Sequence, residues 1–382
     1  MKLCRTAKLK LNMKVDQILP SLQAYTNALN LVCQVGYDNK ISNAIELHKL
    51  TYQDCRINFN LPSQLAISAR TKAVEALKSI KSKNKYSKCP QSKLSSIRLD
   101  CNSYSLLKSG EVSILTIDGR KKIKLNIPVY YQHYFNEWKY TSADLVLKKG
   151  KVYLHISFEK DIEDIKSNGK FLGVDRGINK LAVTSNNKFY SGDKLKLICQ
   201  KRKTLRSNLQ KNGSKSAKRH LKKLSGKEKR FKADLNHKIS KEIINSLNSG
   251  DTIALEKLTG IRNQKVRKRQ RAALNSWNYY QLEQFLIYKA IAKGINVVYV
   301  NPAYTSQKCS KCGNIDKKNR KNQANFCCKS CGFKLNADLN ASRNISVRAL
   351  DSYKLSNGAV VNQPIVGAEM LLTSHQPCAG GN

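Results

Sequence analysis

Two cysteine pairs near the C-terminal end constrain the possible folds of this chain most strongly. They have the same spacing, Cys309-x-x-Cys312 and Cys328-x-x-Cys331, and a glycine follows each pair. The glycine permits the tight turn that directs both thiolates of a pair toward one metal ion, and four thiolates make a closed tetrahedral zinc site. We therefore expect these four cysteines to hold one structural Zn²⁺. Free buried thiols are the alternative interpretation, and the presence of two pairs disfavours a redox CxxC motif.

The net charge restricts the binding partners. The chain has 382 residues, with 70 Lys and Arg against 26 Asp and Glu, so its formal charge is +44. A charge of that size destabilises a compact protein through self-repulsion unless a polyanion neutralises it, and nucleic acid is the expected partner. A basic ribosomal or membrane-surface protein is the alternative. The densest basic runs are residues 201–230 and 262–271, and we expect part of these runs to contact phosphates.

The N-terminal sequence and the distribution of apolar residues speak against a secreted or membrane protein. MKLCRTAKLKLNMK is charged throughout and lacks the apolar core of a signal peptide, and the chain has no apolar run of about 18 residues. The twelve cysteines are therefore not expected to form a disulfide framework. We expect a cytoplasmic, nucleoid-associated protein of two to three domains.

The first half of the chain changes from a strand pattern to a helical pattern and back. TAKLKLNM predicts a strand, and residues 16–85 then show helical periodicity, clearest in the apolar stripe of LPSQLAISARTKAVEALKSI. Two alternating segments follow, with hairpin turns expected at Asp118-Gly119 and Lys149-Gly150. This order suggests a helical domain inserted into a β-barrel-like domain.

From Gly169 onward, short apolar strands alternate with longer helices. FLGVD, TIALE and INVVYV read as buried strands, and KLAVTSNNKFYSG reads as a hairpin that turns at Asn186-Asn187. The basic run 201–230 is expected to be helical and to lead into an amphipathic helix, and a second helix is expected over about 274–293. A short helix begins near Asp338, and the residues from 351 onward predict a loose tail.

Three acidic residues stand at the ends of apolar elements in a chain that has few acids. Asp175 closes the strand FLGVD, Glu256 closes TIALE, and Asp338 opens the short helix in LNADLNASRNI. If the strands are neighbours, the carboxylates converge, and their repulsion favours a cation between them. Hard oxygen ligands suit Mg²⁺, and two such ions support phosphodiester hydrolysis. Taken singly, each acid also fits the role of a turn or cap residue.

These segments resemble the transposon-encoded TnpB (OrfB) family and the related compact type V CRISPR effectors. GVDRGINKLAV, IALEKLTGIR and TSQKCSKCG…FCCKSCGFKLNADLNASRNI resemble the three RuvC-type motifs and the inserted zinc ribbon. The resemblance implies a multidomain α+β fold: a β-barrel-like wedge domain with an inserted helical recognition domain, then an RNase H-like (RuvC) α/β nuclease domain with the inserted ribbon. The implied ranges are 1–15 and 94–165 for the wedge domain, 16–93 for the recognition domain, 166–304 and 337–350 for the nuclease domain, 305–336 for the zinc ribbon and 351–382 for a disordered tail.

The resemblance also implies a function. Members of the family are RNA-guided DNA endonucleases that bind an RNA from the transposon end, recognise a short motif beside the target and cut both strands at one RuvC-type site. By this resemblance Asp175, Glu256 and Asp338 hold two catalytic Mg²⁺ ions. We expect Arg343 to lie near the active site, as a support for a phosphate or for Asp338. The implied partners are guide RNA and double-stranded target DNA, with one chain per RNA favoured.

Two other functions stay open. One is a nuclease-inactive, RNA-guided DNA-binding protein or repressor, which the complete set of three acids disfavours. The other is a guide-free nuclease of the RuvC fold, which the zinc ribbon and the separate N-terminal half disfavour.

Overall fold

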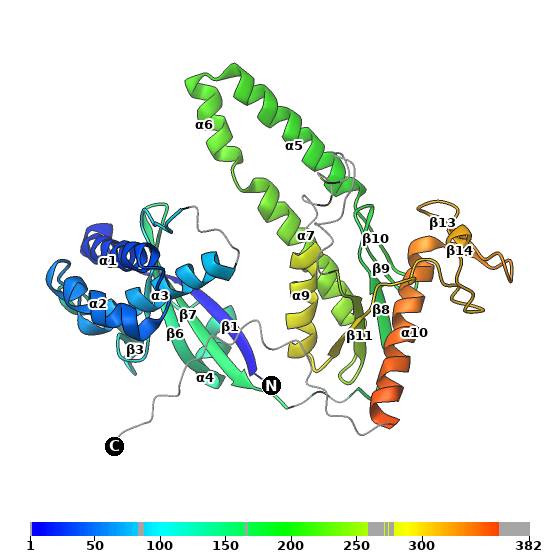
Figure 1. Cartoon of the computed structure of the whole chain (residues 1–382), viewed down its shortest axis with the longest axis horizontal. Helices are drawn as coiled ribbons and strands as arrows, with labels where there is room; N and C mark the ends of the chain where they lie inside the picture. The colour runs from blue at the N-terminus through cyan, green and yellow to red at the C-terminus, as the bar shows by residue number, and fades with distance from the viewer. Residues whose placement is uncertain are drawn as a thin grey trace. The chain divides into compact units, whose positions relative to one another are not determined.

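The structure, a computed structural model, describes residues 2–82, 88–163, 165, 167–258, 271, 274 and 279–358. The chain divides into two compact units, Met1–Glu163 and Asp164–Asn382 (Figure 1). Within the described residues, no helix has the length and apolar character needed to cross a bilayer.

The first unit contains two antiparallel sheets and four α-helices among its described residues. The order in the four-stranded sheet is β1 (Lys2–Lys10), β7 (Lys151–Asp161), β6 (Lys139–Lys148) and β2 (Ile97–Leu99). The three-stranded sheet has the order β3 (Tyr104–Leu106), β4 (Glu111–Thr116) and β5 (Gly119–Lys124). Both predicted hairpins are confirmed, because β4 pairs with β5 and β6 pairs with β7 across short turns.

The first helices of this unit lie, in sequence, between the two edge strands of one sheet. These are η1 (Val15–Gln17), α1 (Leu19–Asp38), α2 (Ala44–Ile57) and α3 (Ser63–Ser82), and they connect β1 to β2. The helical segment thus lies between strands of one sheet in the chain order, while the division into an inserted helical domain and a β-barrel-like domain stays a prediction. A fourth helix, α4 (Val129–Glu137), was not expected from the sequence.

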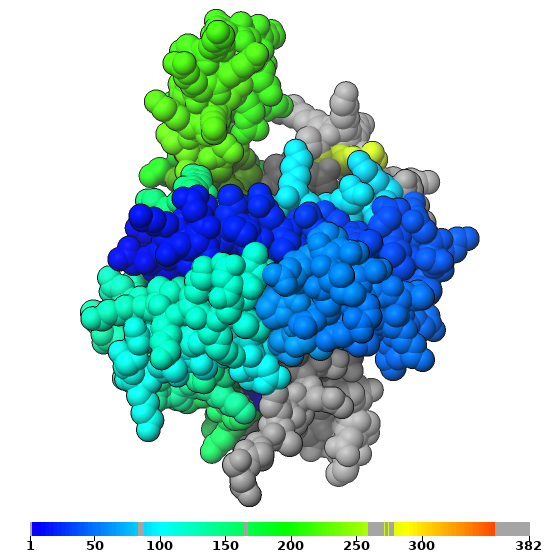
Figure 2. Space-filling view, turned by 90° about the vertical axis from the view of Figure 1, so that its left-hand side faces the viewer, coloured from blue at the N-terminus to red at the C-terminus, as the bar shows by residue number. Residues whose placement is uncertain are grey.

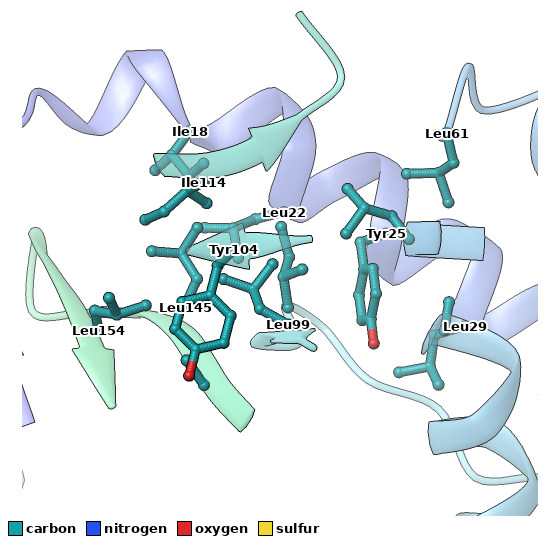
Figure 3. Close-up of a cluster of buried hydrophobic side chains, with 14 of the residues drawn as sticks. Ile18, Leu22, Tyr25, Leu29, Leu61, Leu99, Tyr104, Ile114, Leu145 and Leu154 are labelled. Atoms are coloured by element: carbon teal, nitrogen blue, oxygen red, sulfur yellow. The ribbon is translucent and has the colours of Figure 1, made fainter. Parts of the chain in front are cut away.

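The inserted helices and the sheets share one hydrophobic core. Ile18, Leu22 and Tyr25 near the start of the helical segment lie in the same buried cluster as Tyr104 and Leu154 from the two sheets (Figure 3). Figure 2 shows part of the surface of this unit, with residues up to about the end of α3 in shades of blue and the later residues in cyan to green. The sequence-based boundary between a recognition domain and a wedge domain stays a prediction.

The second unit is built on a five-stranded mixed sheet. Its order is β10 (Phe189–Ser191), β9 (Lys180–Thr184), β8 (Phe171–Asp175), β11 (Thr252–Glu256) and β12 (Asn296–Val300). β8, β11 and β12 are parallel, and β9 is antiparallel to both of its neighbours. The predicted hairpin at Asn186-Asn187 is the β9–β10 connection, where Asn187 has a φ of 69°.

Helices cover both faces of this sheet (Figure 1). On one face, α7 (Lys227–Asn245) and α9 (Tyr279–Ala292) pack on alternate strand residues such as Val174 and Leu255. On the other face, Ile345 and Ala349 of α10 (Ala337–Gly358) pack on Ala254. The parallel strands are therefore apolar on both sides, which explains why they read as continuous apolar runs.

Gly173 allows α10 to lie close to the sheet. A Cβ atom at Gly173 would overlap the backbone carbonyl oxygen of Ser342, so only glycine fits there without displacing the helix. The Ser346 hydroxyl donates a hydrogen bond of 2.7 Å to the carbonyl oxygen of Phe171 at the start of β8. Helix α10 thus runs antiparallel to β8, with its first turn toward the C-terminal end of that strand.

The remaining elements are a helical hairpin and a small ribbon. The hairpin consists of α5 (Asp193–Asn212) and α6 (Lys215–Leu224). This hairpin projects from the sheet (Figure 1). The ribbon contains η3 (Lys317–Asn319), β13 (Asn325–Cys327) and β14 (Lys334–Asn336). Because α10 continues to Gly358, the predicted end of that helix near residue 350 was wrong; residues 359–382 lie outside the described part of the chain. The predicted basic run 262–271 also lies outside the described residues, except for Arg271.

Candidate metal and nucleic-acid sites

The fold brings the three predicted acids to one edge of the five-stranded sheet. Asp175 and Glu256 are the last residues of β8 and β11, which are parallel neighbours with Val174 opposite Leu255. Asp338 lies in the first turn of α10, one helical turn before Ser342, which contacts Gly173. Asp338 lies four residues before Ser342 in the helix, and Asp175 lies two residues after Gly173 in the strand. Each of these steps covers about 6 Å. Because the helix and the strand are antiparallel, both steps lead in the same direction, so Asp338 lies beside Asp175.

The pKa values show that the acids act on one another. Burial, and then the negative charges of Glu256 and Asp338, raise the pKa of Asp175 to about 7. Burial also raises the pKa values of Glu256 and Asp338. Carboxylates that share a poorly solvated site resist ionisation unless a cation neutralises them. The arrangement is therefore suited to hold divalent cations.

The four cysteines form the one group of three or more His, Cys, Asp or Glu side chains that is identified as able to hold a metal ion among the described residues, and their ligand atoms all lie within 4.8 Å of one another.

Two arginines lie at the acid cluster, and sequence reasoning identified neither. Arg320 of the ribbon makes an ion pair with Asp338, with 3.4 Å between Nη2 and Oδ1. The role expected for Arg343 stays a prediction. Arg176 is fully buried and donates a hydrogen bond of 2.7 Å to the carbonyl oxygen of Glu256, while its other Nη binds the carboxylate of Glu283.

Glu256 is hydrogen-bonded at its carboxylate as well as at its carbonyl. The Thr305 hydroxyl donates to Oε1 of Glu256 over 2.5 Å, and this bond opposes the rise that burial causes in the pKa of Glu256. Thr305 is buried and precedes the first cysteine pair in the chain. A threonine in a polar loop gives no sequence signal for such a role.

The four predicted cysteine ligands come together in the ribbon. The Sγ atoms of Cys309 and Cys331 are 3.8 Å apart, and those of Cys312 and Cys328 are 3.5 Å apart. Thiolates at about 2.3 Å from a central zinc would be separated by roughly 3.8 Å, so the spacing fits a tetrahedral ion. The backbone N–H of Cys331 is the main group that lowers the pKa of the Cys328 thiol, to about 7.

The two halves of this site have the same local geometry. Gly313 and Gly332 follow the pairs with φ values of 78° and 70°, a conformation that glycine adopts without strain. Each donates its N–H to the carbonyl oxygen of the first cysteine of its pair. Cys327, next to a ligand in sequence, lies outside the four-sulfur group.

The hairpin of α5 and α6 forms a basic surface. Leu221 and Leu224 of α6 are half-buried and Ala217 is buried, whereas its five basic residues are all exposed. These are Lys215, Lys218, Arg219, Lys222 and Lys223. We call this set the α6 basic face. Its charge and exposure suit contacts with phosphate groups.

The comparisons with known proteins agree with this arrangement. A family model described as "Probable transposase" matches residues 155–276, and one described as "Cas12f1-like, TNB domain" matches residues 279–345. A TnpB-like protein of Methanocaldococcus jannaschii is 31% identical over 261 residues, which cover 63% of this chain and 91% of that protein. The chain belongs to the TnpB family.

Compact type V effectors are also similar to this TnpB-family chain. A CRISPR-associated endodeoxyribonuclease Cas12f1 of Syntrophomonas palmitatica is 31% identical over 270 residues, or 57% of this chain. The chain spans about half of that relative's length, 54%. A cryo-EM structure of a Cas12f1–sgRNA–target DNA complex has a similar fold, with a TM-score of 0.54 and 18% identity over 85% of this chain and 80% of that chain.

Proposed function

We propose that this TnpB-family protein is an RNA-guided, Mg²⁺-dependent DNA endonuclease. The observation that carries the proposal is the convergence of Asp175, Glu256 and Asp338 at one sheet edge. The strand order β10-β9-β8-β11-β12, with β9 antiparallel, supports an RNase H-like (RuvC-type) nuclease domain with one active site. The Cas12f1 relative is named an endodeoxyribonuclease, and the solved relative is a complex with guide RNA and target DNA, which supports the same function.

The chain's own residues have distinct parts in the proposed reaction. Asp175, Glu256 and Asp338 would hold two Mg²⁺ ions, which when bound activate a water molecule and stabilise the leaving oxygen. Arg176 fixes the backbone of Glu256, and Arg320 supplies a positive charge beside Asp338 that can meet a phosphate of the DNA. The four cysteines would hold one structural Zn²⁺, since four protein ligands leave no open position.

Sequence recognition is assigned to the guide RNA. The protein then needs mainly charge to hold the RNA–DNA duplex through its backbone, and the α6 basic face provides exposed charge of that kind. We propose that the RNA derives from the transposon end and that cleavage of both strands occurs beside a short target-adjacent motif.

The test is cleavage by the purified protein with its co-purified RNA. That RNA is sequenced, and a plasmid with the matching target and randomised flanks is offered with Mg²⁺. We expect linear plasmid from the wild type, none from Asp175→Ala, and equal binding of RNA and target by both proteins. Linearisation by Asp175→Ala at the wild-type rate would remove Asp175 from the mechanism. Target binding without cleavage by the wild type would favour the repressor, and cleavage without RNA would favour the guide-free nuclease.

A further inference from the structure

A buried polar network connects the ribbon to the acid cluster. Thr305 is 4% exposed, Asn340 is fully buried and Asn344 is 6% exposed. Buried polar side chains are retained when their hydrogen bonds are satisfied, and all three residues make such bonds here. The network lies between the two candidate metal sites, so its contacts bear on both.

The two asparagines bind the segment that leads into the first cysteine pair. Nδ2 of Asn344 donates to the carbonyl oxygens of Thr305, over 2.8 Å, and Lys308, over 2.7 Å. Nδ2 of Asn340 also donates to Lys308, over 2.8 Å, and its Oδ1 accepts from the Ser310 N–H over 3.0 Å. The backbone on both sides of Cys309 is thus attached to helix α10, which carries Asp338 two residues before Asn340.

Thr305 completes the connection to Glu256. Its hydroxyl lies 2.5 Å from Oε1 of Glu256 and 3.1 Å from the carbonyl oxygen of Pro302. The hydroxyl has one proton, and the charged carboxylate is the stronger acceptor of the two. With Oε1 engaged by Thr305, the second carboxylate oxygen of Glu256 is left to bind a cation.

We propose that Thr305 is a positioning residue for Glu256, and that Asn340 and Asn344 fix Thr305 and the first cysteine pair on α10. The zinc ribbon thereby sets the geometry of the acid cluster, so the two metal sites are coupled. A hydrogen bond to a metal-binding carboxylate changes metal affinity without touching the metal itself. This inference rests on the proposed function, because it takes the three acids as cation ligands.

The test measures Mn²⁺ binding to the zinc-loaded protein by electron paramagnetic resonance, without nucleic acid. Thr305→Val removes the hydroxyl at nearly constant shape and should weaken Asp175-dependent Mn²⁺ binding about 10- to 100-fold. Thr305→Ser keeps the hydroxyl and should bind Mn²⁺ as the wild type does. Thr51→Val is the matched control, because Thr51 is also buried and donates to a backbone carbonyl, that of Leu47, in the first unit.

The outcomes separate this inference from the proposed function. Equal Mn²⁺ affinity in Thr305→Val and the wild type, with zinc content and melting temperature preserved, would overturn the role of Thr305. Mn²⁺ binding that Asp175→Ala leaves intact would instead overturn the acid cluster as the cation site, and with it both proposals. Coupling to the ribbon predicts that removing zinc from the folded wild type with a chelator weakens Mn²⁺ binding; unchanged binding in the zinc-free protein would refute the coupling.

Discussion

Gly173 in strand β8 and Ser342 in helix α10 meet backbone to backbone, which sets how closely the helix that carries Asp338 approaches the strand that carries Asp175. Gly173→Ala should force the helix outward, because the added Cβ would overlap the Ser342 carbonyl oxygen. We expect a decrease of about 1–3 kcal/mol in the free energy of unfolding and slower cleavage under conditions where the variant is folded. Urea denaturation and cleavage rates measure the two effects. Wild-type values for both would show that the helix can adjust at no cost.

Stability of the Mg²⁺-free protein should depend on the ionisation of Asp175. The pKa of Asp175 is raised from 3.8 to about 7 in the fold, so the folded protein holds this proton more tightly than the unfolded chain does. The resulting stabilisation is fully present below about pH 4 and is lost as the pH rises through about 7. Glu256 and Asp338 contribute in the same direction, because burial raises the pKa of each.

Asp175→Asn isolates this contribution. Between pH 5 and pH 8, the unfolding free energy of the Mg²⁺-free variant should fall less than that of the wild type, as measured by urea denaturation of the zinc-loaded proteins without added Mg²⁺. Added Mg²⁺ should stabilise the wild type more at pH 8 than at pH 6, because the ion competes with protons for the carboxylates. Parallel pH profiles for the two proteins would contradict the raised pKa.

The loss of zinc should depend on which cysteine of the ribbon is replaced. Cys312→Ser removes one of the four converging sulfurs, and we expect this variant to lose zinc and the ordered ribbon. Cys327→Ser changes the neighbour of a ligand and should keep one zinc per chain. Metal analysis of both purified variants is the measurement. Zinc retained by Cys312→Ser, or absent from Cys327→Ser, would show that the ligand set is different.

Arg320 should affect cleavage more than stability. Its ion pair with Asp338 is about a quarter exposed on each side, so Arg320→Ala should change the unfolding free energy by only about 0–1 kcal/mol. The loss of positive charge beside the acids should slow cleavage about 100-fold at saturating DNA. Lys321→Ala is the control, since this neighbouring cation is exposed. Equal rates for both variants would place Arg320 outside the reaction.

The α6 basic face should contribute to nucleic-acid binding through charge alone. Replacing its five residues with Gln should weaken binding and lower the slope of log affinity against log salt by about 0.9 for each duplex phosphate that the variant no longer neutralises. A control variant, in which each Lys of this face is replaced with Arg and Arg219 with Lys, keeps the charge and should therefore keep the slope. Separate titrations with the co-purified RNA and with target DNA identify which of the two this face binds. Unchanged slopes for both ligands would exclude it as a binding surface.

The sequence predicted those features that depend on local pattern. Strands β8 and β11 were recognisable because they are buried on both faces and so are apolar throughout, and the acid that ends each one stood out against them. The cysteine spacing identified the ribbon, because a tetrahedral metal site demands paired ligands. The catalytic role of Asp175, Glu256 and Asp338 stays a prediction.

The sequence did not predict features that depend on three-dimensional proximity. Arg320 is one of 70 basic residues, and its pairing with Asp338 arises only when the ribbon folds back on α10. Thr305, Asn340 and Asn344 have polar side chains that usually indicate surface loops, yet they are buried. The end of α10 was placed too early because Ser and Asn residues in its last turns suggested a tail.

The chain order of the second unit has a consequence for biosynthesis. Strand β8, strand β11 and the ribbon all leave the ribosome before α10, whose first turn supplies the last of the three acids. A nascent chain that ends before residue 338 therefore lacks one of the three acids and also the helix that covers one face of the sheet. The proposed nuclease site can be complete only after α10 has been synthesised.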